Sequence, residues 1–287
     1  MPSRECHGHE VALITGASRG MGRAIAVQLA QDGFDLCLVA RSQRQLEATA
    51  RRCQLANPKS RTLILPSDLS RLEGIPGIID TCVKTLGGLD VLVNNAGMNI
   101  QNVCSSASMA TWDQELVVNL LAPMHLTHFA APHLVNVGSK GSAREGGHVV
   151  MICSLMSKLK PAAGMSAYTC TKYGLRGFGY GVFEDLRERG VSVTNIYPGL
   201  TNTALGAQFR QGFSELSELK HHEMLQPTDI AQTVSFAVKE SRRSTSCVSE
   251  ILLDSQLPLF RLNKEALEHE WAHVEGILHD ISTRLSA

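Results

Sequence analysis

Short apolar runs alternate along this chain with longer segments of helical periodicity, and this alternation restricts the fold more than any other feature. The runs are five to seven residues long and rich in Val, Ile and Leu, which is typical of strands buried on both faces of a parallel sheet. They predict strands at 10–15, 34–40, 61–65, 89–93, 147–153, 191–196 and 248–254. The segments between them predict helices at 20–32, 42–56, 72–87, 110–135, 166–189 and 228–240. This order indicates an α/β fold with a doubly wound, seven-stranded parallel sheet and helices on both faces.

The chain has 287 residues, 44% of them hydrophobic, and is long enough to bury a large core. It contains no internal repeat and no interdomain linker, so we predict a single domain over 1–287 with a core at about 10–255. Residues 199–226 contain no obvious strand and are expected to form a lid. Beyond Pro258, apolar residues recur three and four positions apart, which predicts an extra C-terminal helix at about 259–287. That helix is expected to pack within the chain or between subunits.

Charge and composition exclude several classes of partner. The 27 basic and 27 acidic residues cancel, so no overall field would attract nucleic acid or an anionic membrane. Residues 1–10 lack the apolar segment of a secretory signal, and no apolar run approaches the roughly 18 residues of a membrane helix. The eight cysteines form no C-x-x-C pair and are expected to be reduced. We therefore expect a cytoplasmic protein without membrane insertion, an organelle being the alternative.

A glycine-rich turn follows the first predicted strand and precedes the first predicted helix. Its glycines allow close approach to the backbone, and the N–H groups at a helix start attract anions. The turn predicts a pyrophosphate site, although its G-x3-G-x-G spacing differs from the common G-x-G-x-x-G dinucleotide pattern. The alternative is a tight turn that serves only packing. The residues expected to contact a dinucleotide here are Gly16, Ser18, Arg19, Gly20, Met21 and Gly22.

The end of the second strand bears on which dinucleotide is bound. In the common pattern, an acidic residue about 20 positions after the glycines accepts hydrogen bonds from the adenosine ribose. Here the strand is followed by Arg41 and Ser42. A carboxylate would repel a 2′-phosphate, whereas Arg41 can pair with it, helped by Arg19 and the Ser42 hydroxyl. NADP(H) is therefore favoured over NAD(H), the alternative being that Arg41 is merely a solvated residue at a helix start.

Tyr168 and Lys172 lie four residues apart in a segment of helical character, which places both side chains on one helix face. A tyrosine with a pKa near 10 is a poor base at neutral pH, but an adjacent ammonium group favours the phenolate. Lys172 would therefore tune Tyr168 as an acid/base that exchanges a proton with a carbonyl or hydroxyl oxygen. By itself the Tyr-x3-Lys pattern is common, and it gains weight from the glycine turn that precedes it.

Four motifs, in this order, resemble those of the short-chain dehydrogenases/reductases, which are single-domain Rossmann oxidoreductases. The resemblance covers about residues 10–255 and implies a Rossmann fold. The motifs are Thr15-Gly-x3-Gly-x-Gly22, Asn94-Asn95-Ala96-Gly97, Ser154 with Tyr168-x3-Lys172, and Pro198-Gly199 followed by Thr203.

The resemblance implies a catalytic tetrad of Asn119, Ser154, Tyr168 and Lys172. Ser154 would hold the substrate oxygen beside the Tyr168 hydroxyl, and Asn119 would support a water that links Lys172 to solvent. Ser154 precedes Tyr168 by fourteen positions, one more than in many members, so Ser157 is the alternative. We favour Ser154 because it directly follows an apolar strand and emerges at the carboxyl edge of the sheet.

The resemblance also implies further cofactor contacts. Lys172 would bind the nicotinamide ribose, and Pro198, Gly199 and Thr203 would flank the nicotinamide. The residues that would contact or line the adenosine side are Asp68, Leu69, Asn95, Ala96 and Gly97.

A zinc-protease pattern near the C-terminus is rejected. His269 and His273 flank Glu270 in an H-E-x-x-H arrangement, in which two histidines bind zinc and the glutamate activates water. Trp271 lies at the centre of the apolar stripe of this segment, so the histidines are expected to face the opposite side. We therefore predict no metal site.

The combined prediction is an NADP(H)-dependent oxidoreductase that transfers a hydride between nicotinamide and a carbonyl or secondary alcohol. An NAD-linked alcohol dehydrogenase and a non-catalytic dinucleotide-binding regulatory or scaffold protein are the alternatives. A homodimer or homotetramer is expected from the resemblance. The substrate is expected to be apolar, such as a ketone, a 3-oxoacyl thioester or a steroid-like or lipid-like carbonyl. The residues that suggest an apolar pocket are Met98, Leu155, Met156, Leu200, Leu205 and Phe209.

Overall fold

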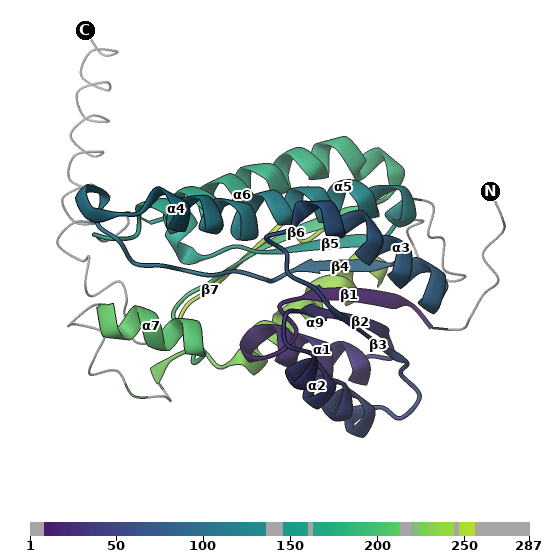
Figure 1. The fold of residues 1–287 in the computed structure, drawn as a ribbon. Coiled ribbons are helices and arrows are strands. Elements are labelled where there is room, and N and C mark those ends of the chain that lie inside the picture. Colours follow the sequence, from purple (N-terminus) through teal and green to yellow (C-terminus); the bar gives the residue numbers. More distant parts are fainter. Residues whose placement is uncertain are drawn as a thin grey trace, which may run out of the picture.

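The computed structural model describes residues 9–135, 146–159, 163–212, 220, 223–243 and 247–255. Within them, seven parallel strands form one sheet in the order β3-β2-β1-β4-β5-β6-β7 (Figure 1). All the predicted strands are confirmed, with ends that shift by a few residues. The strands are β1 (Val11–Thr15), β2 (Asp35–Ala40), β3 (Thr62–Pro66), β4 (Val91–Asn94), β5 (His148–Ile152), β6 (Ser192–Pro198) and β7 (Glu250–Leu253).

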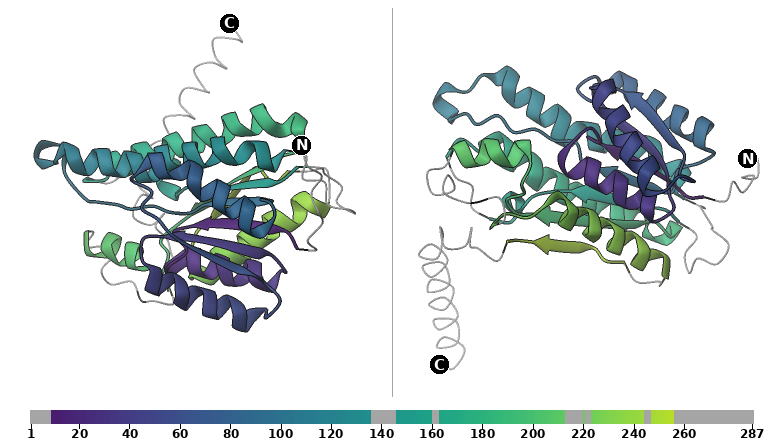
Figure 2. Two further views of the ribbon diagram at one scale, coloured as in Figure 1. Left: turned by 45° about the vertical axis from the view of Figure 1, so that its right-hand side comes forward. Right: turned by 90° about the horizontal axis from the view of Figure 1, so that it is seen from below.

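Helices cover both faces of the sheet, which confirms the doubly wound α/β fold (Figures 1 and 2). One layer consists of α1 (Gly20–Gln31), α2 (Gln43–Ala56) and α9 (Pro227–Arg243). The opposite layer consists of α3 (Ile75–Leu86), α4 (Met109–Leu116), α5 (Ala122–Leu134) and α6 (Ser166–Leu186). A further helix, α7 (Ala204–Gly212), lies near the carboxyl ends of the strands.

The continuous apolar strands explain why the protein has two cores. Successive side chains of a strand point to opposite faces of the sheet. Val11 and Leu13 of β1 belong to the core beneath α3, α5 and α6, whereas Ala12 and Ile14 belong to the core beneath α1, α2 and α9. Because Val11 to Ile14 are all apolar, this strand supplies both layers.

The chain reverses its direction of winding between β1 and β4, which are neighbours in the sheet. It leaves β1 for α1 on one face and leaves β4 for α4 on the other. The two connections diverge at the carboxyl ends of these strands and leave a crevice between them. Ligands of open α/β sheets bind at such a switch point.

Two predicted segments differ from expectation in detail. The helix predicted at 110–135 is divided into α4, a π-helical turn at Val117–Leu121, and α5. Apolar periodicity does not reveal this turn because one widened turn barely alters the pattern of buried positions. In its described residues, the segment 199–226, predicted to be a lid without strands, contains α7 and an isolated parallel bridge between Thr201 and Leu225.

Several predictions lie outside what can be described. The C-terminal helix at about 259–287 and the H-E-x-x-H segment fall beyond the described residues. In the described ranges, no helix has the length and apolar character to cross a membrane. Nor do three His, Cys, Asp or Glu side chains of these ranges gather as a metal site. The single-domain organisation stays a prediction.

Candidate active site

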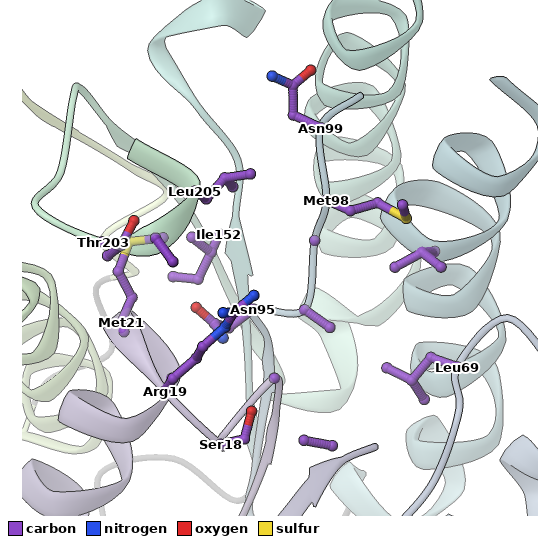
Figure 3. Close-up of a pocket in the computed structure, with 18 of the residues that line it drawn as sticks. Ser18, Arg19, Met21, Leu69, Asn95, Met98, Asn99, Ile152, Thr203 and Leu205 are labelled. Carbon is purple, nitrogen blue, oxygen red and sulfur yellow. The ribbon is translucent and has the colours of Figure 1, made fainter. Parts of the chain in front are cut away.

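A cavity of about 590 Å³ occupies the switch point (Figure 3). It extends from the glycine turn, where Ser18 and Arg19 lie, to Asn99 at the opposite end. Met21, Thr203 and Leu205 line it between these ends. The predicted cofactor residues that line the cavity are Gly16, Ser18, Arg19, Gly20, Met21, Gly22, Arg41, Ser42, Asp68, Leu69, Asn95, Ala96, Gly97, Tyr168, Lys172 and Thr203.

Two predicted cofactor residues, Pro198 and Gly199, are not among the residues that line the cavity. Pro198 is buried at the end of β6, and the N–H of Gly199 donates to the carbonyl of Leu253 at 2.7 Å. An added Cβ at Gly199 would lie 2.6 Å from Asp254 Oδ1. Packing against the end of β7 therefore explains the glycine at this position.

The glycine turn needs glycine for two different reasons. Gly16 and Gly20 have φ angles of +66° and +55°, in the left-handed region that a side chain disfavours. A Cβ at Gly22 would lie 2.3 Å from the carbonyl oxygen of Gly16 and 2.5 Å from Asn95 Nδ2. The helix that follows has no side-chain cap, since its N-cap residue, Arg19, makes no capping hydrogen bond. Backbone N–H groups at the start of α1 therefore face the cavity and suit an anionic ligand.

Thr15 joins the turn to the end of β4. Its hydroxyl accepts hydrogen bonds from the N–H groups of Asn95 and Ala96, at 2.9 and 3.0 Å, and donates to the carbonyl of Val93 at 3.2 Å. Asn95 Nδ2 donates to the Thr15 carbonyl at 2.7 Å. These bonds place the Asn94-Asn95-Ala96-Gly97 motif directly beside the glycine turn, as a brace between neighbouring strands.

Basic side chains lie at the end of the cavity beside the glycine turn. We call this the dinucleotide end, because the sequence predicts that a dinucleotide binds there. Arg19 and Arg41 line it and are exposed. Ser42 caps α2, with its Oγ accepting from the Gln45 N–H at 3.4 Å. A hydrogen bond from the Ser70 backbone, assisted by the charge of Arg41, holds the pKa of Asp68 below its usual range. The ends of β2 and β3 thus bring Arg41 and Asp68 close together.

Tyr168 lies in the first turn of α6 and is only 5% exposed. The side chain of Ser154, which follows β5, lies beside its hydroxyl. Burial raises the pKa of Tyr168 to about 12, although the neighbouring Ser154 side chain acts in the opposite direction. The phenol is therefore protonated at neutral pH and able to donate. Phe209 of α7 contacts the Tyr168 ring edge-on, with ring centroids 5.4 Å apart.

The hydroxyl of Ser157, the alternative to Ser154, is used in a hydrogen bond to the backbone. It is fully buried, and its Oγ donates to the carbonyl oxygen of Ser154 at 2.6 Å. Ser154 Oγ also accepts from the Met156 N–H at 3.1 Å, so its hydroxyl is fixed next to Tyr168.

Lys172 lies one helical turn after Tyr168 and is 4% exposed. Its Nζ donates to the carbonyl of Ile152 at 2.9 Å and lies 5.8 Å from the centroid of the Tyr168 ring. Burial lowers the pKa of Lys172 to about 8. The expectation that both side chains share one face is confirmed by their common position in the cavity wall.

Asn119 is fully buried in the π-helical turn, and both the oxygen and the nitrogen of its side-chain amide are hydrogen-bonded. Its Oδ1 accepts from the Met98 N–H, and its Nδ2 donates to the Met98 carbonyl, both at 2.8 Å. Nδ2 also lies 3.2 Å from Thr171 Oγ1. An added Cβ at Gly97 would contact both Asn119 Oδ1 and Lys172 Nζ, at 3.5 and 3.6 Å. Asn119 therefore fixes the segment after β4 beside Lys172.

The wall at the Asn99 end contains residues that motifs do not reveal. Met98 and Leu205, two of the six residues expected to form an apolar pocket, line the cavity. Leu155 and Leu200 are buried instead. Polar groups join the apolar ones at this end, so the wall is mixed. The additional lining residues are Asn99, Ile100, Gln114, Val118, Ile152, Cys153, Ala204 and Gln208, with Ala40, Gln45 and Ser67 at the dinucleotide end.

Comparisons with known proteins agree with this geometry. The family model described as short chain dehydrogenase matches residues 10–213. An uncharacterized oxidoreductase of Staphylococcus aureus (strain USA300) is 27% identical over 233 residues, which is 81% of this chain and 92% of that protein. The crystal structure of a metagenomic short-chain oxidoreductase in complex with NADP is 31% identical, with a TM-score of 0.70 over 87% of this chain and 98% of that one. A short chain dehydrogenase from Burkholderia cenocepacia J2315, also in complex with NADP, is 28% identical, with a TM-score of 0.73 over 85% and 96%. The chain therefore belongs to the short-chain dehydrogenase/reductase family of Rossmann-fold oxidoreductases.

Proposed function

We propose that this protein is an NADP(H)-dependent oxidoreductase that interconverts a carbonyl compound and a secondary alcohol. The observation that carries the proposal is that the buried Tyr168 and Lys172 line the same cavity as the glycine turn, with the Ser154 side chain beside Tyr168. An acid/base pair and an anion-binding turn in one cavity suit hydride transfer better than a binding function alone.

The dinucleotide would lie along this cavity. The N–H groups at the start of α1 would hold its pyrophosphate, because the glycines leave only backbone at the closest approach. Lys172 would bind the nicotinamide ribose beside Tyr168, and Thr203 would contact the nicotinamide end. When bound, the cofactor supplies or accepts the hydride at nicotinamide C4.

In the direction of reduction, Ser154 would donate a hydrogen bond to the carbonyl oxygen and hold it near the Tyr168 hydroxyl. Tyr168 would pass its hydroxyl proton to this oxygen as the carbonyl is reduced, and would itself become a phenolate. The Lys172 ammonium, on the same face, would stabilise that phenolate. Asn119 would keep Lys172 and the segment after β4 in place. In the direction of oxidation the same groups act in reverse.

NADP(H) is proposed over NAD(H) because Arg19 and Arg41 present two guanidinium groups at the dinucleotide end. Two similar structures were solved in complex with NADP, which supports the proposal. The substrate would be a ketone or aldehyde, or the matching alcohol, that fits a wall of mixed polarity.

The test is NADPH consumption across ketones and 3-oxoacyl thioesters of increasing chain length. Wild-type protein is expected to turn over some of them, and Ser154→Ala to lose nearly all of that activity. Arg41→Asp is expected to weaken NADPH binding and leave NADH binding nearly unchanged. If Arg41→Asp keeps the NADPH preference, the phosphate argument fails. No turnover across the panel would favour a regulatory or scaffold role.

A further inference from the structure

Arg23 lies directly after the glycine turn, on α1, and no motif gives it a role. Its Nη2 donates to the carbonyl oxygen of Ser18, and its Nε donates to Thr49 Oγ1 at 3.2 Å. Thr49 is fully buried on α2 and donates to the carbonyl oxygen of Ala17 at 2.9 Å. Two successive carbonyl groups of the turn are therefore held by side chains that do not line the cavity.

These bonds determine where the N–H groups of the same two peptides point. In a trans peptide, the N–H and C=O groups point in opposite directions, and the described residues contain no cis peptide. Since the carbonyls of Ala17 and Ser18 turn toward Thr49 and Arg23, the N–H groups of Ser18 and Arg19 turn away from them. That direction leads to the cavity, which both residues line. In the described part of the chain, neither N–H group donates to another backbone group.

The position of this part of the turn indicates which phosphate it faces. The N–H of Ala17 donates to the carbonyl of Val39 at 3.2 Å, so the turn passes beside the end of β2. Arg41 and Ser42, which follow β2, line the cavity at this side. The start of α1, by contrast, is the place for the pyrophosphate. The Ser18 and Arg19 N–H groups therefore suit a phosphate on the adenosine ribose.

We propose that Arg23 and Thr49 are positioning residues for NADP(H) selectivity, which hold the Ala17 and Ser18 carbonyls so that the Ser18 and Arg19 N–H groups receive the 2′-phosphate. The inference rests on the proposed NADP(H) preference and extends it to two residues outside the cavity. Neither side chain touches the phosphate itself. Both act through the backbone of the turn.

The test compares dissociation constants for NADPH and NADH, measured by fluorescence titration of the full-length protein. Arg23→Met and Thr49→Val are each expected to weaken NADPH binding about tenfold, since each loosens an N–H donor to a charged group. NADH binding is expected to change by less than about threefold, since it has no 2′-phosphate to lose. In turnover, the loss is expected in KM for NADPH rather than in kcat. Arg23→Lys, which keeps a donor for Ser18, is expected to recover part of the selectivity.

Arg52→Gln is the matched control, since it removes a positive charge from α2 and makes no hydrogen bond to the turn in the described structure. It is expected to change the NADPH-to-NADH ratio less than Arg23→Met does. If Arg23→Met and Thr49→Val weaken both cofactors equally, the two residues only support folding of the turn, and the inference is wrong while the NADP(H) preference stands. An equal effect of Arg52→Gln would also overturn it, in favour of a general field. If wild-type protein binds both cofactors equally, the proposed preference fails and this inference fails with it.

Discussion

Replacing the buried Lys172 with methionine is expected to stabilise the protein while it removes activity. Burial lowers the pKa of Lys172 from 10.5 to about 8, and each pKa unit corresponds to about 1.4 kcal/mol. Keeping this ammonium charged in the folded protein therefore costs about 3 kcal/mol at neutral pH. Methionine avoids that cost but leaves the Ile152 carbonyl without its 2.9 Å donor, a loss of about 1 kcal/mol. The net expectation at pH 7 is a variant about 2 kcal/mol more stable than the wild type.

The pH dependence has a definite sign. Below about pH 8 the lysine is protonated in both the folded and the unfolded protein, so its cost is fully present. Between about pH 8 and 10.5 only the unfolded chain holds the proton, so the wild type gains stability relative to Lys172→Met as pH rises. The difference is expected to fall from about 2 kcal/mol at pH 7 to about 1 kcal/mol at pH 9.

The assay is urea unfolding of both proteins at the two pH values, without cofactor. Comparing the two proteins cancels the titration of the buried thiols, which are common to both. Lys84→Met, on an exposed position of α3, is the control for loss of one lysine and is expected to change stability by less than about 0.5 kcal/mol. A less stable Lys172→Met at pH 7, or a difference that does not change with pH, would refute the reasoning.

Four further predictions concern residues in and around the site. Gly22→Ala is expected to destabilise the protein by about 1–3 kcal/mol and to weaken NADPH binding, because its Cβ would lie 2.3 Å from a facing carbonyl oxygen. Gly177→Ala, on α6 with nothing within 4 Å of its Cβ, is expected to stabilise the protein by about 0.5–1 kcal/mol in the same urea unfolding assay. Thr15→Val removes the acceptor of two N–H groups, so a loss of about 2 kcal/mol and weaker NADPH binding are expected, and unchanged titrations would contradict this. Ser157→Ala is expected to keep most of the turnover that Ser154→Ala loses, and equal losses would reopen the choice between the two serines.

Local patterns predicted the strands well because most of them contain a continuous run of apolar residues. Val11 to Ile14 show this most clearly, since all four side chains are buried and they feed both cores. The Tyr168-x3-Lys172 spacing likewise placed two side chains on one face, because α6 is regular there. These features depend on neighbours in the sequence.

The features that sequence patterns missed depend on contacts between distant segments. Thr49 and Arg23 read as ordinary helix residues, and only the fold brings them against the glycine turn. Gly199 is predicted to flank the nicotinamide, and only the fold shows that it also packs against Asp254. Asn99 carries no motif that marks it as part of the cavity wall. The oligomeric state, the cellular location and the substrate stay predictions. They depend on surfaces and binding partners, which sequence motifs do not describe.

The most direct measurement of the central claim is isotope transfer from NADPH labelled with deuterium at nicotinamide C4. With a ketone that the wild-type protein reduces, the account predicts deuterium on the carbinol carbon of the alcohol product. It also predicts that Tyr168→Phe still binds NADPH but forms this product about a hundredfold to ten-thousandfold more slowly. An alcohol without the label, or a Tyr168→Phe variant as fast as the wild type, would contradict it.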